Sequence, residues 1–205
     1  MRRGRNRKAR RVGEKKRIKM RKNSFLFMVV ILTVSIALTC CKKDKKLEIG
    51  QKHEGGIIFY LDGSGEHGMV CAESDQSTSA YWFNGTYVQT NANGSAIGTG
   101  QANTSTIVST LGAGNYAAKI CDDLVLSNYS DWFLPSFEEL LLMCKNLSEV
   151  GLGSFSINNH YWSSSQIAGN GGALSLKIID HPSSEHGYQT NYETATERVR
   201  AARTF

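Results

Sequence analysis

The chain has 205 residues, a length that accommodates one folded domain with additional segments. Its 24 Lys and Arg outnumber its 18 Asp and Glu, but residues 1–22 alone hold 13 bases and one acid, and residues 42–46 hold four bases and one acid. Residues 47–205 therefore keep 7 bases against 16 acids, a net charge of −9. Because binding to a polyanion needs clustered Lys and Arg, this composition argues against a nucleic-acid-binding domain.

An uncharged segment follows the basic N-terminus. Its apolar centre, Phe25 to Leu38, is 14 residues long, which suits a secretory signal peptide better than a membrane span of about 20 residues. The segment ends in "LTCCKKD" and resembles a bacterial lipoprotein signal, which implies that Cys41 is diacylated, with Cys40 as a second candidate. The alternative is an uncleaved single-pass anchor. Both interpretations place the following domain outside the cytoplasm, because the bases precede the apolar segment.

Two methionines are candidate start sites of translation. Met20 gives the signal peptide a short basic region of ordinary size, whereas Met1 adds a long basic extension, so we expect Met20 to be the true start. The lysine-rich tract after Cys41 predicts a short solvated tether close to the bilayer, with its bases toward any anionic headgroups. The expected organisation is a basic extension (1–19), a signal peptide (20–40), a tether (41–52) and one exported domain (53–205).

From residue 53 onward, short apolar runs alternate with Gly, Asn, Ser and Thr. The runs "GGIIFYLD" (55–62) and "HGMVCAES" (67–74) predict two strands joined by a Gly-containing hairpin loop. The run "YWFNGTYV" (81–88) predicts a further hairpin with Asn84-Gly85 as its turn. The polar, Gly-rich stretch 91–104 predicts an irregular surface loop.

Two or three helices are predicted next. Residues 103–111 and 115–126 carry apolar side chains at helical spacing. A third helix begins at Ser136, because Glu139 three residues later completes a capping box and Pro135 rigidifies the entry. The last strands are predicted at 161–168, 173–180 and 198–205. Strands, then helices, then strands, without β-α-β alternation, indicate an α+β fold.

Seven blocks of residues 53–205 appear in the order of a known family: "GGIIFYLD", "HGMVCAESDQSTSAYW", "AIGTGQANTSTIV", "GAGNYAAKICDDL", "YSDWFLPSFEELLLM", "YWSSS" and "VRAARTF". In these blocks the chain resembles the DUF1566 family, also called the Lcl C-terminal domain family. The resemblance implies a C-type-lectin-like fold and an exported or lipoprotein setting. It also implies adhesion or carbohydrate binding, since one adhesin of the family binds sulfated glycosaminoglycans.

The stretch "DWFLPSFEEL" (131–140) concentrates large apolar side chains and carboxylates. Tryptophans on sugar-binding surfaces stack on pyranose rings, which is the functional interpretation. A Trp-Phe-Leu run before a capping box is more typical of a helix packed onto a sheet. We therefore interpret six residues in and around this stretch as structural: Asp131, Trp132, Pro135, Ser136, Glu139 and, in a later strand, Trp162.

Arg203 is also expected to be structural. Alternation in the last predicted strand places it on one face with Val199, Ala201 and Phe205. A charge among apolar neighbours needs a partner, because an unpaired buried charge is very costly. We predict that Asp131 or a nearby acid is that partner.

Three cysteines remain in the exported domain, Cys71, Cys121 and Cys144. A disulfide between Cys121 and Cys144 and buried free thiols are both open alternatives. Cys71 or Cys121 with His67 or His160 gives the residue types of a Cys/His hydrolase, but nothing marks an oxyanion hole. The sequence contains no H-E-x-x-H, nucleophile elbow or phosphate loop. We expect no catalytic residue and no cofactor.

Binding is the remaining class of function, and the predicted ligand residues are Asp75, Trp82 and Asn84, beside the polar 91–104 stretch. Asp75 offers the hard oxygens that Ca²⁺ prefers, but no ordered ligand series accompanies it. The two histidines of "HPSSEH" (181–186) are an alternative metal site. We predict no metal.

A net charge of −9 fits a neutral glycan or a protein better than a sulfated polymer, unless Arg198 and Arg200 form a local basic patch. We expect a lipoprotein of the cell envelope whose domain binds an extracytoplasmic glycan or protein without catalysis. The alternatives are a structural component of a cell-surface or periplasmic assembly, and an enzyme of unknown chemistry.

Overall fold

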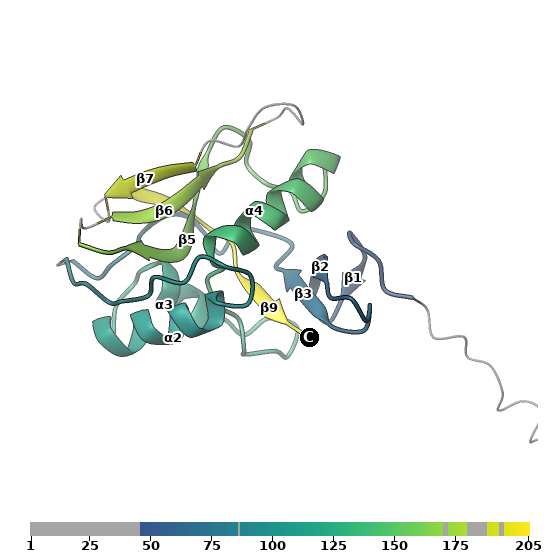
Figure 1. Cartoon of the computed structure of the whole chain (residues 1–205), viewed down its shortest axis with the longest axis horizontal. Helices are drawn as coiled ribbons and strands as arrows, with labels where there is room; N and C mark the ends of the chain where they lie inside the picture. The colour runs from purple at the N-terminus through teal and green to yellow at the C-terminus, as the bar shows by residue number, and fades with distance from the viewer. Residues whose placement is uncertain (1–45, 86, 170–171, 180–187, 193–194) are drawn as a thin grey trace, which may run out of the picture. The chain divides into compact units, whose positions relative to one another are not determined.

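The computed structural model describes residues 46–85, 87–169, 172–179, 188–192 and 195–205 (Figure 1). The signal peptide, the start site, Cys40, Cys41 and the 181–186 metal candidate lie outside the described residues. Helices combined with mostly antiparallel strands in two sheets make an α+β fold, which confirms the predicted class. Within the described ranges, no helix has both the length and the apolarity needed to cross a membrane.

The first sheet joins the two ends of the domain. In spatial order it consists of β1 (Lys52–His53), β2 (Gly56–Leu61), β3 (Gly68–Cys71) and β9 (Ala202–Thr204). Every neighbouring pair is antiparallel. The predicted hairpin is present as β2 and β3, and a backbone hydrogen bond from Asp62 N to His67 O (2.9 Å) closes its loop.

The second sheet consists, in spatial order, of β4 (Ser77–Tyr81), β8 (Thr196–Val199), β5 (His160–Ile167), β6 (Gly172–Lys177) and β7 (Tyr188–Tyr192). Its neighbours are antiparallel except β5 and β8, which run parallel. The hairpin predicted at 81–88 is wrong, because β4 ends at Tyr81 and pairs with β8 near the C-terminus. Non-local pairing has overridden the local turn signal of Asn84-Gly85.

Three α-helices and one short 3-10 helix are described: α2 (Gly100–Leu111), α3 (Ala117–Asp122), α4 (Phe137–Asn146) and η1 (Ser148–Val150). Helix α2 begins inside the stretch that was predicted to be a surface loop, and α3 is shorter than predicted. The capping box at the start of α4 is confirmed. The Ser136 hydroxyl accepts from Glu139 N, while the Glu139 carboxylate accepts from Ser136 N at 2.8 Å.

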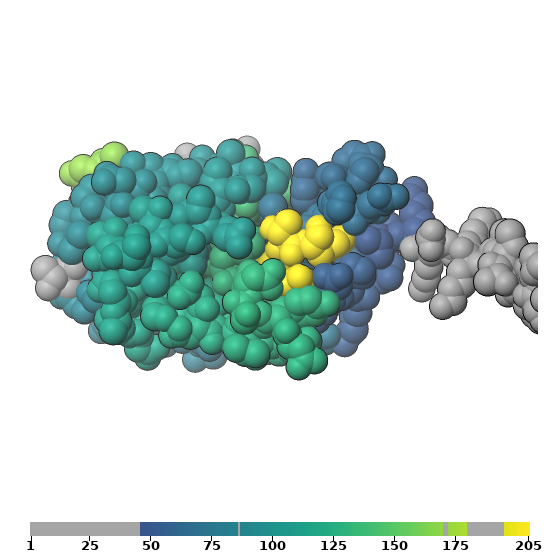
Figure 2. All heavy atoms as spheres, turned by 90° about the horizontal axis from the view of Figure 1, so that it is seen from below, coloured from purple at the N-terminus to yellow at the C-terminus, as the bar shows by residue number. Residues whose placement is uncertain are grey.

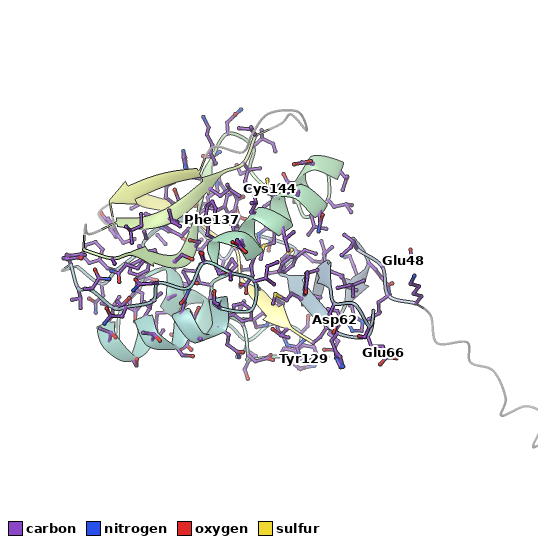
Figure 3. All side chains as sticks on the ribbon, in the orientation of Figure 1. Glu48, Asp62, Glu66, Tyr129, Phe137 and Cys144 are labelled. Carbon is purple, nitrogen blue, oxygen red and sulfur yellow. The ribbon has the colours of Figure 1, made fainter. Side chains whose placement is uncertain are left out.

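Two hydrophobic clusters lie on opposite faces of β5, because consecutive residues of a strand point to opposite sides. Trp162 belongs to the first cluster, together with Trp82, Trp132 and the apolar sides of α2 and α3. Tyr161 belongs to the second cluster, which α4 covers; Figure 3 labels Phe137 and Cys144 of this helix. With both faces covered, β5 lies in the middle of the core.

The last residues of the chain connect the two sheets. The strand predicted at 198–205 is in fact two strands, β8 and β9, which Arg200 and Ala201 separate. β8 belongs to the second sheet and β9 to the first. Figure 2 shows the C-terminal residues in yellow at the surface, between the N-terminal strands in blue and a segment in green. Arg200 therefore lies where the chain crosses from one sheet to the other.

Candidate functional site

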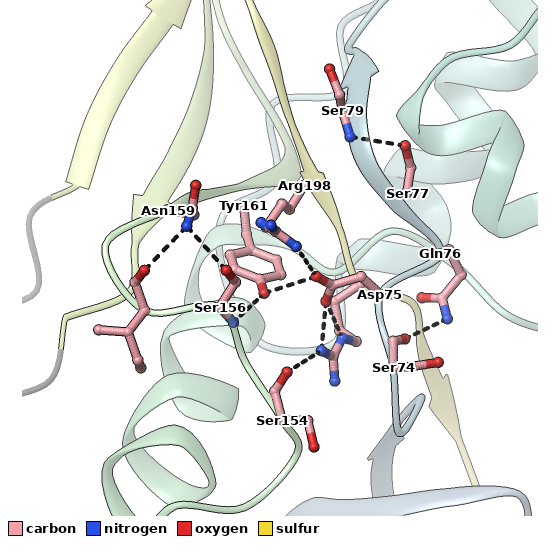
Figure 4. Close-up of polar contacts among 12 residues, drawn as sticks. Ser74, Asp75, Gln76, Ser77, Ser79, Ser154, Ser156, Asn159, Tyr161 and Arg198 are labelled. Atoms are coloured by element: carbon pink, nitrogen blue, oxygen red, sulfur yellow. Dashed lines mark hydrogen bonds and ion pairs between the residues drawn. The ribbon is translucent and has the colours of Figure 1, made fainter.

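Asp75, the first predicted ligand residue, lies between β3 and β4. Its Oδ1 accepts hydrogen bonds from Arg200 Nε (2.9 Å) and Nη2 (2.5 Å), and its Oδ2 accepts from Arg198 Nη1 (2.8 Å) and the Tyr161 hydroxyl (3.1 Å) (Figure 4). A carboxylate has about four acceptor positions, so this one is fully used. The hypothesis that Asp75 binds a ligand or Ca²⁺ is therefore wrong, and the residue is structural.

Arg200 is fully buried and uses all its N–H donors. Three of its hydrogen bonds go to backbone carbonyls: Nη1 donates to Ala72 O (2.9 Å) and Gly153 O (2.6 Å), and Nη2 donates to Ser154 O (3.4 Å). With its two bonds to Asp75, this one side chain ties the end of β3 and the loop after α4 to the crossing between the sheets.

The predicted basic patch of Arg198 and Arg200 is not free. Both guanidinium groups pair with Asp75, at 2.8 Å and 2.5 Å. At least five of the seven bases in residues 47–205 make ion pairs with carboxylates. A sulfated polymer would have to displace these acids, so the idea of a local basic patch is not supported.

Trp82, the second predicted ligand residue, is fully buried. Its Nε1 donates to Ser163 O (2.9 Å), and Trp162 Nε1 donates in return to Ala80 O (2.8 Å). These reciprocal bonds hold the end of β4 and the segment after it against β5. Trp82 is a core residue that cannot stack on a sugar ring, so its assignment to ligand binding is wrong.

Asn84, the third predicted ligand residue, caps the end of α2. Its Nδ2 donates to Leu111 O (2.5 Å) and to Ala113 O (3.3 Å). Backbone carbonyls at a helix C-terminus lack partners within the helix, so this side chain satisfies a structural need. Asp75, Trp82 and Asn84 therefore do not converge on one site.

The interpretation of the 131–140 stretch as scaffold agrees with the contacts of its residues. Arg203 Nε donates to Asp131 Oδ1 (2.5 Å), which confirms the predicted ion pair. The prediction missed a second acid, since Arg203 Nη1 also donates to Glu54 Oε2 (2.9 Å). The guanidinium lies over the Tyr129 ring, 3.7 Å from its centroid, and Trp132 is buried in the first cluster.

Glu139 is a fully buried carboxylate where the N-termini of α2 and α4 meet. It accepts hydrogen bonds from three backbone N–H groups, those of Ser136 (2.8 Å), Gly98 (2.7 Å) and Gly100 (3.3 Å). Burial raises its pKa above the ordinary value, whereas the hydrogen bonds act in the opposite direction. A Cβ atom at Gly100 would overlap this carboxylate, which explains a glycine as the first residue of α2.

The serine-rich centre of β5 fixes the polar stretch that was expected to form a free binding loop. Ser165 Oγ donates to Gly94 O (2.7 Å), and Ser164 Oγ accepts from Asn103 Nδ2 (3.2 Å). Gln166 Oε1 accepts from Thr90 N (2.7 Å) just before this stretch. The polar atoms of "SSSQ" are thus used to hold neighbouring segments against the core.

Cys71, Cys121 and Cys144 are buried and belong to no disulfide. Cys121 belongs to the first hydrophobic cluster and Cys144 to the second, so the buried-thiol alternative holds and the disulfide does not. Burial raises the pKa of Cys71 and of Cys144 to about 12, and it raises the pKa of Cys121 as well. A protonated, buried thiol is a poor nucleophile, which counts against a hydrolase built on Cys71 or Cys121.

Side chains of the types that bind metals are scattered over the part of the chain that the structure describes. Across those ranges, no group of three or more His, Cys, Asp and Glu side chains is placed to hold a metal ion. Burial, with a smaller effect of Lys177, lowers the pKa of His160 and so favours its neutral form. Its Nδ1 lies 3.4 Å from Ser175 Oγ, within the second sheet.

An exposed aromatic side chain lies instead on β4, at the edge of the second sheet. Ala80 is buried in the first cluster, so its neighbours Ser79 and Tyr81 project from the opposite face. Tyr81 pairs with Thr196 of β8, and Arg198 follows on the same face. We call these four residues, Ser79, Tyr81, Thr196 and Arg198, the Tyr81 face. Tyr81 is 51% exposed.

Buried contacts hold the Tyr81 face in place. The Tyr81 ring packs edge-on against Phe83, with centroids 6.4 Å apart, and Phe83 is buried. Arg198 is fixed by Asp75 beneath it. Sequence reasoning missed Tyr81 because alternation shows only that Tyr81 and Trp82 point to opposite sides. Which of the two is buried depends on the pairing of β4 with the distant strand β8, and in the structure Trp82 is buried and Tyr81 is exposed.

Comparison with protein-family models finds none that matches the chain, and comparison with curated proteins finds no match either.

Proposed function

We propose that the chain is a membrane-anchored lipoprotein of the cell envelope, and that its domain binds a neutral extracytoplasmic glycan through the Tyr81 face. The lipoprotein-like signal that ends at Cys41 supports the anchoring. The resemblance to the Lcl C-terminal domain family supports an adhesin-like, carbohydrate-binding role and a C-type-lectin-like fold. Both supports come from the sequence.

One observation carries the choice of surface. Tyr81 presents a half-exposed aromatic ring at the edge of the second sheet, and the small hydroxyl side chains of Ser79 and Thr196 are exposed beside it. The apolar face of a sugar ring stacks on an aromatic ring, while hydroxyls exchange hydrogen bonds with the sugar hydroxyls. A ring held by buried neighbours also loses little entropy on binding.

The charge distribution favours a neutral ligand. Residues 47–205 carry a net charge of −9, and the one cation of the Tyr81 face, Arg198, is paired with Asp75. A polyanionic ligand would meet a repulsive field and no unpaired base on this face.

The internal use of polar groups supports a binding role without catalysis. Carboxylates and thiols are catalytic groups in many enzymes. In this domain Asp75 and Glu139 accept hydrogen bonds from the scaffold, and the three thiols are buried. Binding needs only a rigid, exposed surface, which the Tyr81 face supplies.

A structural role in a surface assembly is the second candidate. β4 is an edge strand of the second sheet, and an edge strand presents backbone groups that a strand from another protein can pair with. This candidate predicts a protein partner rather than a glycan.

A glycan array probed with the purified full chain tests the proposal. We expect a selective signal that free glycan competes away and that Tyr81→Ala abolishes. Tyr87→Ala is the matched control, because Tyr87 is 47% exposed and its hydroxyl donates to Gln89 (2.9 Å), whose side chain bonds Gln166 and Gly169 at the end of β5. Equal loss in both variants, or no selective signal from the unmodified chain, would refute glycan binding at this face.

A further inference from the structure

Three large apolar side chains are exposed where the tether enters the domain. Ile49 is 42% exposed, and Val150 and Leu152, just after α4, are 64% and 41% exposed. We call these three residues the Ile49 patch. Most of the other large apolar side chains of the domain are buried in the two clusters, so an exposed group of this kind is unusual.

The two turns that carry the Ile49 patch are packed against each other. Gly50 has a positive φ of 84°, and the Leu152 side chain lies 2.7 Å from where a Cβ at Gly50 would be. Backbone hydrogen bonds fix both turns, since Gly50 N donates to Ile58 O (2.8 Å) and Leu152 N donates to Leu147 O (2.8 Å). The apolar side chains are therefore presented by ordered backbone rather than by a loose end.

The tether limits how far this patch can lie from the membrane. Ile49 follows Cys41 by eight residues, which span at most about 28 Å even when fully extended. Among the exposed large apolar side chains of the described residues, that of Ile49 is nearest to Cys41 along the chain.

We propose that the Ile49 patch docks onto the bilayer that holds the lipid of Cys41. This inference rests on the proposed lipoprotein anchoring. Insertion of the three side chains into the interface removes apolar surface from water, and the attached lipid makes this second contact intramolecular. The acids Glu48, Asp62 and Glu66, which Figure 3 labels around the first sheet, are repelled by anionic headgroups. Docking is therefore expected on neutral, zwitterionic lipid.

Tryptophan fluorescence tests this contact directly, because Trp82, Trp132 and Trp162 are all buried. The full lipidated chain carrying Leu152→Trp is reconstituted into phosphatidylcholine vesicles with and without bromine on the acyl chains. Bromine quenches only tryptophans that reach the lipid. Val150→Trp is a second variant in case Leu152→Trp disturbs the packing on Gly50.

Ile97→Trp is the matched control, because Ile97 is 40% exposed and lies near the N-terminal end of α4, where Glu139 binds Gly98. That end is about 15 Å from the helix end that precedes the patch. We expect brominated lipid to reduce the emission of Leu152→Trp and Val150→Trp, and to leave Ile97→Trp like the unmodified chain.

Flotation of the same samples separates the two hypotheses. If the chain floats with the vesicles and neither patch variant loses emission, docking is refuted while the anchor stands. Equal loss in the control variant also refutes docking at this patch. If the chain does not float at all, the proposed anchoring itself fails.

Discussion

Replacement of Arg200 by Met should be among the most destabilising single substitutions in the domain. Arg200 is fully buried, donates to both the Asp75 carboxylate and three backbone carbonyls, and lies 4.3 Å from the centroid of the Phe155 ring. Methionine fills part of the volume but leaves those acceptors unpaired.

The magnitude follows from the partners that lose their bonds. Breaking a buried ion pair costs about 3–5 kcal/mol. Asp75 keeps Arg198 and the Tyr161 hydroxyl, so we expect the lower end, about 3 kcal/mol of unfolding free energy. Domains of this size are stable by only about 5–15 kcal/mol, so the loss is readily measured.

Arg203→Met is the matched control. Arg203 is nearly as buried, but its partners Asp131 and Glu54 are 50% and 37% exposed. Water can therefore solvate the acids left behind, and we expect a loss of about 1 kcal/mol. Guanidinium-induced unfolding followed by circular dichroism measures both variants. A loss below about 1 kcal/mol for Arg200→Met, or a larger loss for Arg203→Met than for Arg200→Met, would refute the assignment of Arg200 as the main stabilising contact between the two sheets.

Three further predictions concern buried groups. Glu139→Ala leaves three backbone N–H groups unpaired and should cost about 3 kcal/mol in chemical denaturation, so a neutral effect would contradict the assigned bonds. Because the pKa of Glu139 is raised, the folded state holds the carboxyl proton more tightly than the unfolded state does. The stability of the unmodified chain relative to Glu139→Gln should therefore fall as the pH rises above 4.5. A relative stability that increases with pH would contradict this direction of the pKa shift. Native Cys71, Cys121 and Cys144 should resist a thiol reagent until denaturant is added, and rapid labelling would show that these thiols are accessible.

Local patterns predicted local structure well. Ser136 and Glu139 three residues apart fixed the start of α4, since both bonds of a capping box form within one turn. The pairing of Arg203 with Asp131 also followed from sequence. A charged side chain on the apolar face of a strand is tolerated only when an opposite charge pairs with it.

Features set by distant segments were not predicted. Asn84-Gly85 has the composition of a hairpin turn, yet β4 pairs with β8, and Asn84 caps α2 instead. The burial of Arg200 depends on a break between β8 and β9 that alternation alone does not show. Trp82 and Tyr81 are adjacent, and the register with β8, which the sequence does not show, decides which of the two is exposed.

The anchoring of the chain through Cys41 is the central claim, because the proposed setting in the cell envelope and the docking of the Ile49 patch both depend on it. Metabolic labelling with palmitate measures it most directly. The account predicts that label enters the unmodified chain and the Cys40→Ser variant and is lost in Cys41→Ser. Absence of label from the unmodified chain, or retention of label when both cysteines are serine, would contradict it.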